Sequence, residues 1–145
     1  MLDIKELVKK NFNDLQSLRR HFHENPELSG KEFQTMDFIE KKLDEYGIPH
    51  LRVENGGIFA WIDGAGQGKT ILLRADIDAL PIKEDGRNLC QNRACISKNN
   101  GVMHACGHDG HIAMQLIEAK LINELKHTWD GKVIFMFEEG EESTA

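Results

Sequence analysis

Three imidazoles and one thiol lie close together in the sequence. Residues 104–111 read His-Ala-Cys-Gly-His-Asp-Gly-His. Neutral imidazole and thiolate are preferred ligands of zinc and chemically similar ions, and a Cys-x-His pair can reach one ion from a tight glycine turn. Because the segment precedes a predicted helix, whose amino-terminal amides favour an anion, we expect a lowered pKa for Cys106. The segment therefore predicts metal chemistry with a readily deprotonated thiol.

Two residues of this segment also suit structural roles. His111 fits a helix cap or a core position as well as it fits a metal ligand. Asp109 fits the N-cap of the following helix, or a partner that orients a ligating imidazole. The sequence leaves these alternatives open.

Two groups of carboxylates follow predicted buried strands. Asp76 and Asp78 follow the strand 71–75, and their spacing of two places both on one side of the chain, although a polar strand exit would look the same. Residues 138–142 read Glu-Glu-Gly-Glu-Glu after the strand 133–137, and their mutual repulsion suits a solvated loop or a multivalent cation. Beside the histidine-rich segment the cation is favoured, since one glutamate can bind metal while its neighbour accepts a proton.

The elements that must position these groups follow from hydrophobic spacing. Apolar residues three and four apart predict a helix over 4–22 and a second helix that ends at Gly47. Ser29 and Glu32 have the spacing of a capping box at the start of the second helix. Residues 112–125 show the same periodicity and predict a third helix.

Strands account for most of the remaining apolar runs. Residues 51–63 suit a hairpin with a Gly-Gly turn, and 70–75 suits a central strand covered by helices on both faces. A further strand is expected over 132–137, and 81–103 should form a long loop. This order predicts an α/β fold with a helix-flanked mixed sheet, in which sites form where strands end and helices begin.

Composition excludes several classes of protein. The 145 residues contain 18 Lys and Arg against 24 Asp and Glu, giving a formal net charge of −6, and no basic cluster interleaves with aromatic residues. A nucleic-acid partner is therefore not expected. No stretch approaches the roughly 20 apolar residues that span a bilayer. Three cysteines without a predicted export signal favour a cytoplasmic protein over a disulfide-stabilised secreted one.

These motifs resemble those of a family of metal-dependent amidohydrolases and peptidases. The family includes aminoacylases, hippurate hydrolases, auxin-conjugate hydrolases and N-acetyl-diaminopimelate deacetylases. The resemblance runs along the chain, through the segment His23-x-x-Pro-Glu-Leu-Ser, the strand exit 74–81 and the highly specific segment 101–111. The last motif, at 137–142, more often reads Phe-Gln-Pro-Ala-Glu-Glu in the family, so that Glu138 and Glu139 stand in place of Gln and Pro.

The resemblance implies roles for five residues. Cys106, His108 and Glu142 would be metal ligands, Glu141 the general base, and Asp78 the aspartate that orients a ligand. It also implies two divalent ions, zinc or manganese, in each complete site. Two further histidine ligands are expected beyond this chain.

The implied reaction is hydrolysis of the amide bond of N-acyl amino acids or small peptides. Residues 1–145 are then expected to form the amino-terminal part of a catalytic domain, without the rest of that domain or the smaller domain that serves as lid and dimer surface. The fragment alone is expected to be inactive, and the full-length protein to be a homodimer.

Two alternatives explain the cysteines differently. A structural zinc module could use Cys90, Cys95, His104 and Cys106, but their spacing is irregular and the glutamate pair would have no role. Alternatively, Cys106 could be a covalent nucleophile with His108 as its base. Residues two apart in a tight turn rarely reach that geometry, so the metal interpretation uses both residues better.

Overall fold

The computed structural model describes residues 3–87 and 93–144. Its helices and strands, in chain order, are α1 Ile4–Glu24, α2 Phe33–Glu45, β1 His50–Val53, β2 Gly57–Asp63, β3 Thr70–Asp76, α3 His108–Glu124 and β4 Lys132–Glu138. Short 3-10 turns follow α3, at Lys126–Thr128, and β4, at Glu141–Thr144. The predicted order of helices and strands is confirmed.

The strands form one mixed sheet in the order β1-β2-β4-β3. β4 pairs antiparallel with β2 and parallel with β3, and α3 makes the crossover that a parallel pair requires. The expectation that β3 is a central strand is therefore wrong for the described part of the chain, because β4 takes the inner position and β3 lies at the edge.

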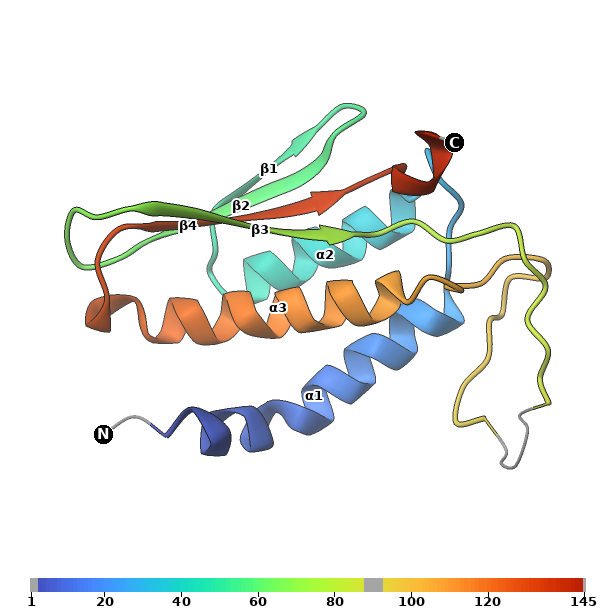
Figure 1. Ribbon diagram of the computed structural model, residues 1–145, viewed down its shortest axis with the longest axis horizontal. Helices are drawn as coiled ribbons and strands as arrows, with labels where there is room; N and C mark the ends of the chain where they lie inside the picture. Colours follow the sequence, from blue (N-terminus) through green and yellow to red (C-terminus); the bar gives the residue numbers. More distant parts are fainter. Residues whose placement is uncertain (1–2, 88–92, 145) are drawn as a thin grey trace.

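All three helices lie on one side of the sheet, with α1 packed against α3 (Figure 1). Alternate residues of β2 and β4 point toward the helices and are buried, as the period of two in a strand requires. The core side chains that they meet on the helices include Phe22, Ile39, Leu43, Ile112 and Leu116. The core therefore fixes the ends of β3, β4 and α3 relative to one another.

The opposite face of the sheet has no helix over it in the described structure. Leu51 of β1 is 59% exposed and Leu72 of β3 is 51% exposed. Trp61, Ile134 and Met136 share this face and are half-buried. Coverage of β3 by helices on both faces, which its apolar sequence predicted, is therefore not observed.

The start of α2 differs from the predicted capping box. The helix begins at Phe33, and its N-cap residue, Glu32, makes no side-chain cap. The Glu27 carboxylate instead accepts hydrogen bonds from the amides of Gln34 (3.3 Å) and Thr35 (2.8 Å). Ser29 and Glu32, the two predicted members of the box, turn toward the ends of β3 and β4.

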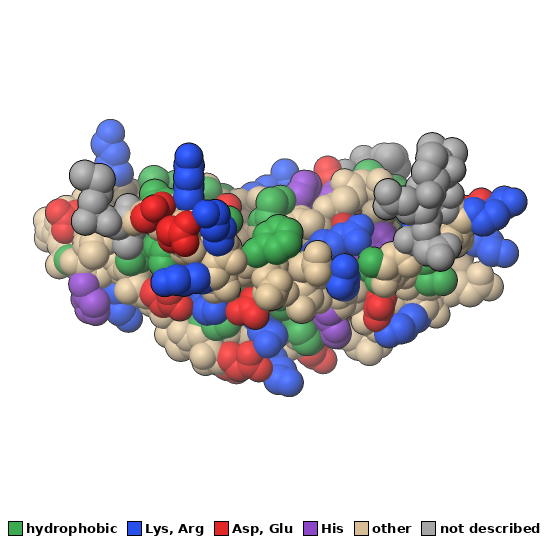
Figure 2. Space-filling model, turned by 90° about the horizontal axis from the view of Figure 1, so that it is seen from below, with side chains coloured by type: hydrophobic (Ala, Val, Ile, Leu, Met, Phe, Trp, Pro, Cys, Tyr) green, Lys and Arg blue, Asp and Glu red, His purple; other side chains and the backbone are tan. Residues whose placement is uncertain are grey.

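The helical side of the molecule carries charges of both signs. Lysine, arginine, aspartate and glutamate side chains are interspersed over this face (Figure 2). Among the described residues, no helix combines the length and the apolar character needed to cross a membrane.

Candidate metal centre

The carboxyl ends of β3 and β4 meet the amino-terminal end of α3. Pairing of the two parallel strands continues one residue past β3, where the Ile77 amide donates to the Glu138 carbonyl at 3.0 Å. This alignment places Asp78 beside the turn that carries Glu141 and Glu142. Gly107, with φ of 82°, ends the preceding loop and starts α3, so His108 enters from the helix. The residues predicted from the sequence thus converge at one end of the sheet.

His108 lies at the centre of the group and is only 4% exposed. Its Nδ1 lies 2.9 Å from the backbone oxygen of Asp78 and 3.1 Å from Asp78 Oδ1. Both partners are acceptors, so in the neutral imidazole Nδ1 carries the hydrogen and Nε2 has the lone pair that a metal would bind. Nε2 lies 3.9 Å from Asp76 Oδ2 and 3.9 Å from Glu142 Oε1.

Three sets of donor atoms surround His108, each with all its atoms within 4.8 Å of one another. One contains Cys106, His108 and Glu142. Another contains Asp76 and His111 with His108, and the third contains Asp78 and Glu141 with His108. A thiolate, an imidazole and a carboxylate suit zinc and its borderline neighbours, so the first set fits the metal that the family resemblance implies.

The pKa of Cys106 differs from the sequence-based expectation. The hydrogen bond to Glu142 raises the pKa of the Cys106 thiol, and the charges of Glu141 and Asp78 add to this effect. The expected lowering by the helix amino-terminus is therefore wrong for the protein without a cation, because neighbouring carboxylates disfavour a second anion. A bound cation would reverse this preference, since it makes a coordinating thiol lose its proton.

Buried carboxylates hold the turn that carries the glutamate pair. Asp78, which is 1% exposed, accepts through Oδ2 from the Glu142 amide at 2.8 Å and from Ser29 Oγ at 2.6 Å. Glu32 Oε1 accepts from the Gly140 amide at 2.7 Å. Sequence reasoning missed these contacts of Ser29 and Glu32 because the capping-box spacing offered both residues a local explanation.

His111 and Asp109 take different positions from those expected. The side chain of His111 is 45% exposed, its Nδ1 lies 3.8 Å from Asp76 Oδ2, and its ring stacks on His108 with centroids 5.3 Å apart. His111 is therefore neither a core residue nor a cap. Asp109 is buried and does not orient His108, because its Oδ2 faces His23 Nδ1 at 2.7 Å and Arg19 Nε at 3.0 Å.

His23 links this region to the long loop after β3. Its Nε2 lies 2.9 Å from Glu84 Oε1, and the other oxygen of Glu84 accepts from the Ser97 amide at 2.6 Å. The ring nitrogens of His23 thus lie beside two carboxylates, with Nδ1 next to Asp109 and Nε2 next to Glu84. Through Glu84, these contacts connect the long loop to the end of α1, next to the start of α3.

The structural zinc module is not supported by the geometry. Cys106 is exposed and groups with His108 and Glu142, whereas neither Cys95 nor His104 joins a donor group in the described ranges. Cys95 Sγ instead lies 3.6 Å from Arg19 Nη1. Cys90 lies outside the described residues.

A covalent role for Cys106 is also disfavoured. The nucleophile of such an enzyme is a thiolate, which a lowered pKa would supply. Hydrogen bonding to Glu142 instead raises the pKa of the Cys106 thiol.

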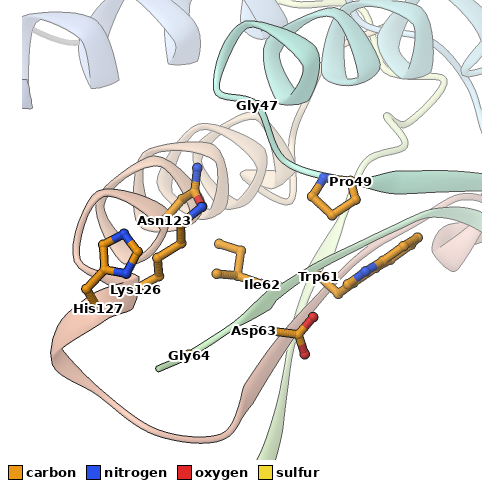
Figure 3. A pocket seen from close by; sticks show the side chains of 9 residues that line it. All are labelled: Gly47, Pro49, Trp61, Ile62, Asp63, Gly64, Asn123, Lys126 and His127. Carbon is orange, nitrogen blue, oxygen red and sulfur yellow. The ribbon is translucent and has the colours of Figure 1, made fainter. Parts of the chain in front are cut away.

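A separate pocket of about 240 Å³ lies at the opposite end of α3 (Figure 3). Ile62 of β2 points toward Asn123 and His127 across it, whereas Trp61 and Asp63 of the same strand point to the other side (Figure 3). None of the residues lining the pocket belongs to the donor groups around His108. The candidate metal centre therefore lies away from this pocket, at the amino-terminal end of α3.

The fold and the donor set are those of an α/β protein with a candidate metal centre. The sequence profile of peptidase family M20/M25/M40 matches residues 72–145, just over half of the chain, and the chain belongs to this family. The matched range contains Asp78, Cys106, His108, Glu141 and Glu142.

Known proteins resemble the chain along nearly all of its length. The N-acyl-L-amino acid amidohydrolase of Geobacillus stearothermophilus is 40% identical over 141 residues, which are 97% of this chain and 37% of the relative. The N-acetyl-L-cysteine deacetylase of Bacillus subtilis (strain 168) is 45% identical over 132 residues, which are 90% of this chain and 30% of the relative. The chain thus spans about a third of their length.

A solved structure supports the fold. A dinuclear metal binding peptidase of the same family from Bacillus subtilis superposes with a TM-score of 0.83 at 40% identity. The match covers 92% of this chain and 37% of that chain.

Proposed function

We propose that this chain contributes the core of the active site of a metal-dependent amidohydrolase that cleaves N-acyl amino acids. The observation that carries the proposal is the convergence of Cys106, His108 and Glu142 at the ends of β3 and β4, with Glu141 in the same turn. The names of the two bacterial relatives, an N-acyl-L-amino acid amidohydrolase and an N-acetyl-L-cysteine deacetylase, support this class of substrate.

Cys106, His108 and Glu142 would hold the metal. Their three atoms lie close enough together to share one ion, and the Asp78 contact leaves His108 Nε2 available to it. A bound divalent ion would supply Lewis-acid polarisation of the substrate carbonyl. The family and the dinuclear relative support two ions in the complete site, for which we propose zinc or manganese.

Glu141 is proposed to be the general base of the reaction. It lies in the donor group with Asp78 and His108 and next in sequence to Glu142, so its carboxylate is close to the reacting centre. It would accept a proton from the attacking water and return it to the leaving amine. Asp78 would act as a positioning residue, because it fixes both the ring of His108 and the amide of Glu142.

Residues 1–145 are proposed to be the amino-terminal part of the catalytic domain. The relatives are about three times as long, which leaves room for the two further histidine ligands and for a second domain. The homodimer and the cytoplasmic location stay predictions.

The proposal is tested by Glu141→Gln in the natural protein that contains this chain. We expect loss of N-acyl amino acid hydrolysis by at least about a hundredfold in kcat, since general acid–base catalysis contributes about 10²–10⁴-fold. Bound metal, measured by elemental analysis, should stay at the wild-type level. Glu139→Gln, in the same acidic segment, is the matched control and should retain activity.

Two results would contradict the proposal. Hydrolysis that persists in Glu141→Gln while metal is lost would exchange the roles of Glu141 and Glu142. Wild-type protein that hydrolyses N-acyl amino acids equally well after exhaustive chelation would remove the metal from the reaction.

A further inference from the structure

The turn that carries Glu141 and Glu142 is fastened at two backbone amides. Glu32 accepts from the Gly140 amide at 2.7 Å, and Asp78 accepts from the Glu142 amide at 2.8 Å. The two amides lie on either side of Glu141 in the sequence. A displacement of the backbone at Glu141 away from Asp78 and Glu32 would therefore break one of these hydrogen bonds.

Burial of the Glu32 carboxyl group lowers the stability of the folded state. Glu32 is 0% exposed, and its Oε2 is buried without a hydrogen-bond partner among the residues that the structure describes. Burial raises the pKa of Glu32, and the nearby charge of Asp78 acts in the same direction. A buried carboxyl oxygen without a partner costs stability, so packing alone does not explain an acid at this position.

The turn needs an acceptor where Glu32 supplies one. Gly140 has φ of 71°, a left-handed conformation that turns the chain sharply after β4. The Gly140 carbonyl accepts from the Ser143 amide at 3.1 Å and from Ser143 Oγ at 2.6 Å, whereas its amide points inward to Glu32. An apolar residue at position 32 would leave this inward amide without its partner.

We propose that Glu32 is a positioning residue of the metal centre, which holds the Gly140 amide and thereby keeps Glu142 and Glu141 in place around His108. The inference rests on the proposed function, because it assumes that Glu142 binds a cation. Within the described ranges, Glu32 belongs to none of the donor groups around His108. It acts by holding the backbone of the turn through the Gly140 amide.

The test compares three variants of the natural protein that contains this chain. Glu32→Gln keeps an oxygen acceptor, and Glu32→Met keeps the approximate size of the side chain without an acceptor. Glu27→Met is the matched control, since it removes the carboxylate that caps α2 from the same segment but makes no contact with Gly140. Each variant is measured for hydrogen exchange of the Gly140 amide by NMR, without metal, and for affinity toward Zn²⁺ by competition with a chromophoric chelator.

Glu32→Met should lose protection of the Gly140 amide and bind Zn²⁺ about tenfold more weakly, in the range typical of residues that support metal ligands. Glu32→Gln should rescue both properties to within about threefold of the wild type. Glu27→Met should lower the melting temperature while leaving Gly140 protection and Zn²⁺ affinity unchanged.

The inference is overturned if Glu32→Met retains wild-type protection at Gly140, whatever its metal affinity. It is also overturned if Gly140 loses protection but Zn²⁺ affinity stays at the wild-type value. If Cys106→Ser bound Zn²⁺ with the affinity of the wild type, the proposed metal centre would be contradicted instead. The hydrogen-exchange measurement would still decide whether Glu32 holds the Gly140 amide.

Discussion

His108 Nδ1 lies within hydrogen-bonding distance of two oxygens of Asp78, the backbone oxygen at 2.9 Å and Oδ1 at 3.1 Å. The other carboxylate oxygen of Asp78 accepts from the Glu142 amide. One buried side chain therefore fixes two proposed ligands, one on α3 and one after β4. This arrangement sets the tautomer of His108 and the position of Glu142 together.

Replacing Asp78 by Asn tests this double role. An amide group can still accept from His108, but its NH₂ would then face the Glu142 amide, where a donor meets a donor. We expect Zn²⁺ affinity to fall about 10- to 100-fold, as is typical when a residue that orients metal ligands is replaced. Ser29→Ala removes only the third partner of Asp78 and should have a smaller effect. Equal affinities for Asp78→Asn and the wild type would contradict the role assigned to Asp78.

Zinc binding should depend on pH through Cys106. Because the hydrogen bond to Glu142 raises the pKa of the thiol, the metal-free thiol is protonated at neutral pH, and binding must release that proton. The affinity for Zn²⁺ should therefore increase with pH by up to about tenfold per pH unit below the thiol pKa. Calorimetric titrations in buffers of different ionisation enthalpy would measure the released protons.

Cys106→Ser supplies the comparison for that experiment. A hydroxyl is a poorer ligand than a thiolate, so affinity should fall, and the proton released by the thiol should disappear. Cys95→Ser is the matched control, because Cys95 lies outside the donor groups of the described structure. The ligand assignment would be wrong if Cys106→Ser bound Zn²⁺ with wild-type affinity and proton release.

Buried His104 should make the chain less stable at mildly acidic pH. Burial lowers the pKa of His104 to about 4, with the charges of His108 and His23 in the same direction and that of Asp109 opposed. Its pKa in the unfolded chain is about 6.5, so the unfolded state binds a proton that the folded state does not. Stability is thus fully present above about pH 6.5 and decreases as the pH falls toward 4.

Urea denaturation of the wild type and His104→Gln at pH 7.5 and pH 5 would measure this contribution. Between these pH values the wild type should lose about 2 kcal/mol more than the variant, which has no ionisable group at position 104. Comparing the two proteins cancels the carboxylates that titrate in both. An identical pH dependence in the variant would show that His104 does not carry the effect.

The 145-residue chain by itself is predicted to lack amidase activity. The family resemblance implies two histidine ligands beyond those present, so metal binding should be weak and the site poorly organised. The sheet face with Leu72 and the open edge of β3 favour association between copies.

Light scattering and assays with N-acyl amino acids in the presence of Zn²⁺ or Mn²⁺ would test this prediction. Association should decrease in Leu72→Lys, while Val8→Lys, a matched change at an exposed position of α1, should have little effect. Metal-dependent turnover by a monomer of the 145-residue chain would contradict both the ligand count and the expected role of this exposed face.

Much of the fold could be predicted because its elements have strong local signals. The amphipathic spacing of α1 and the alternating or continuous apolar runs of β2 and β4 are properties of neighbouring residues. The candidate metal ligands could be predicted for the same reason, since Cys106, His108 and the Glu141-Glu142 pair lie in short sequence motifs. Residue types and spacing therefore sufficed to predict an α/β fold and a candidate set of metal ligands.

Tertiary structure decided what local patterns cannot encode. The spacing of Ser29 and Glu32 fits a capping box, but packing of this segment beside β3 and β4 gives their side chains to Asp78 and Gly140 instead. In the same way, a helix amino-terminus predicts a low pKa for Cys106, whereas carboxylates from two other segments raise it. Long-range contacts prevailed in both cases because, at short distance, a buried hydrogen bond or a charged neighbour outweighs a local preference.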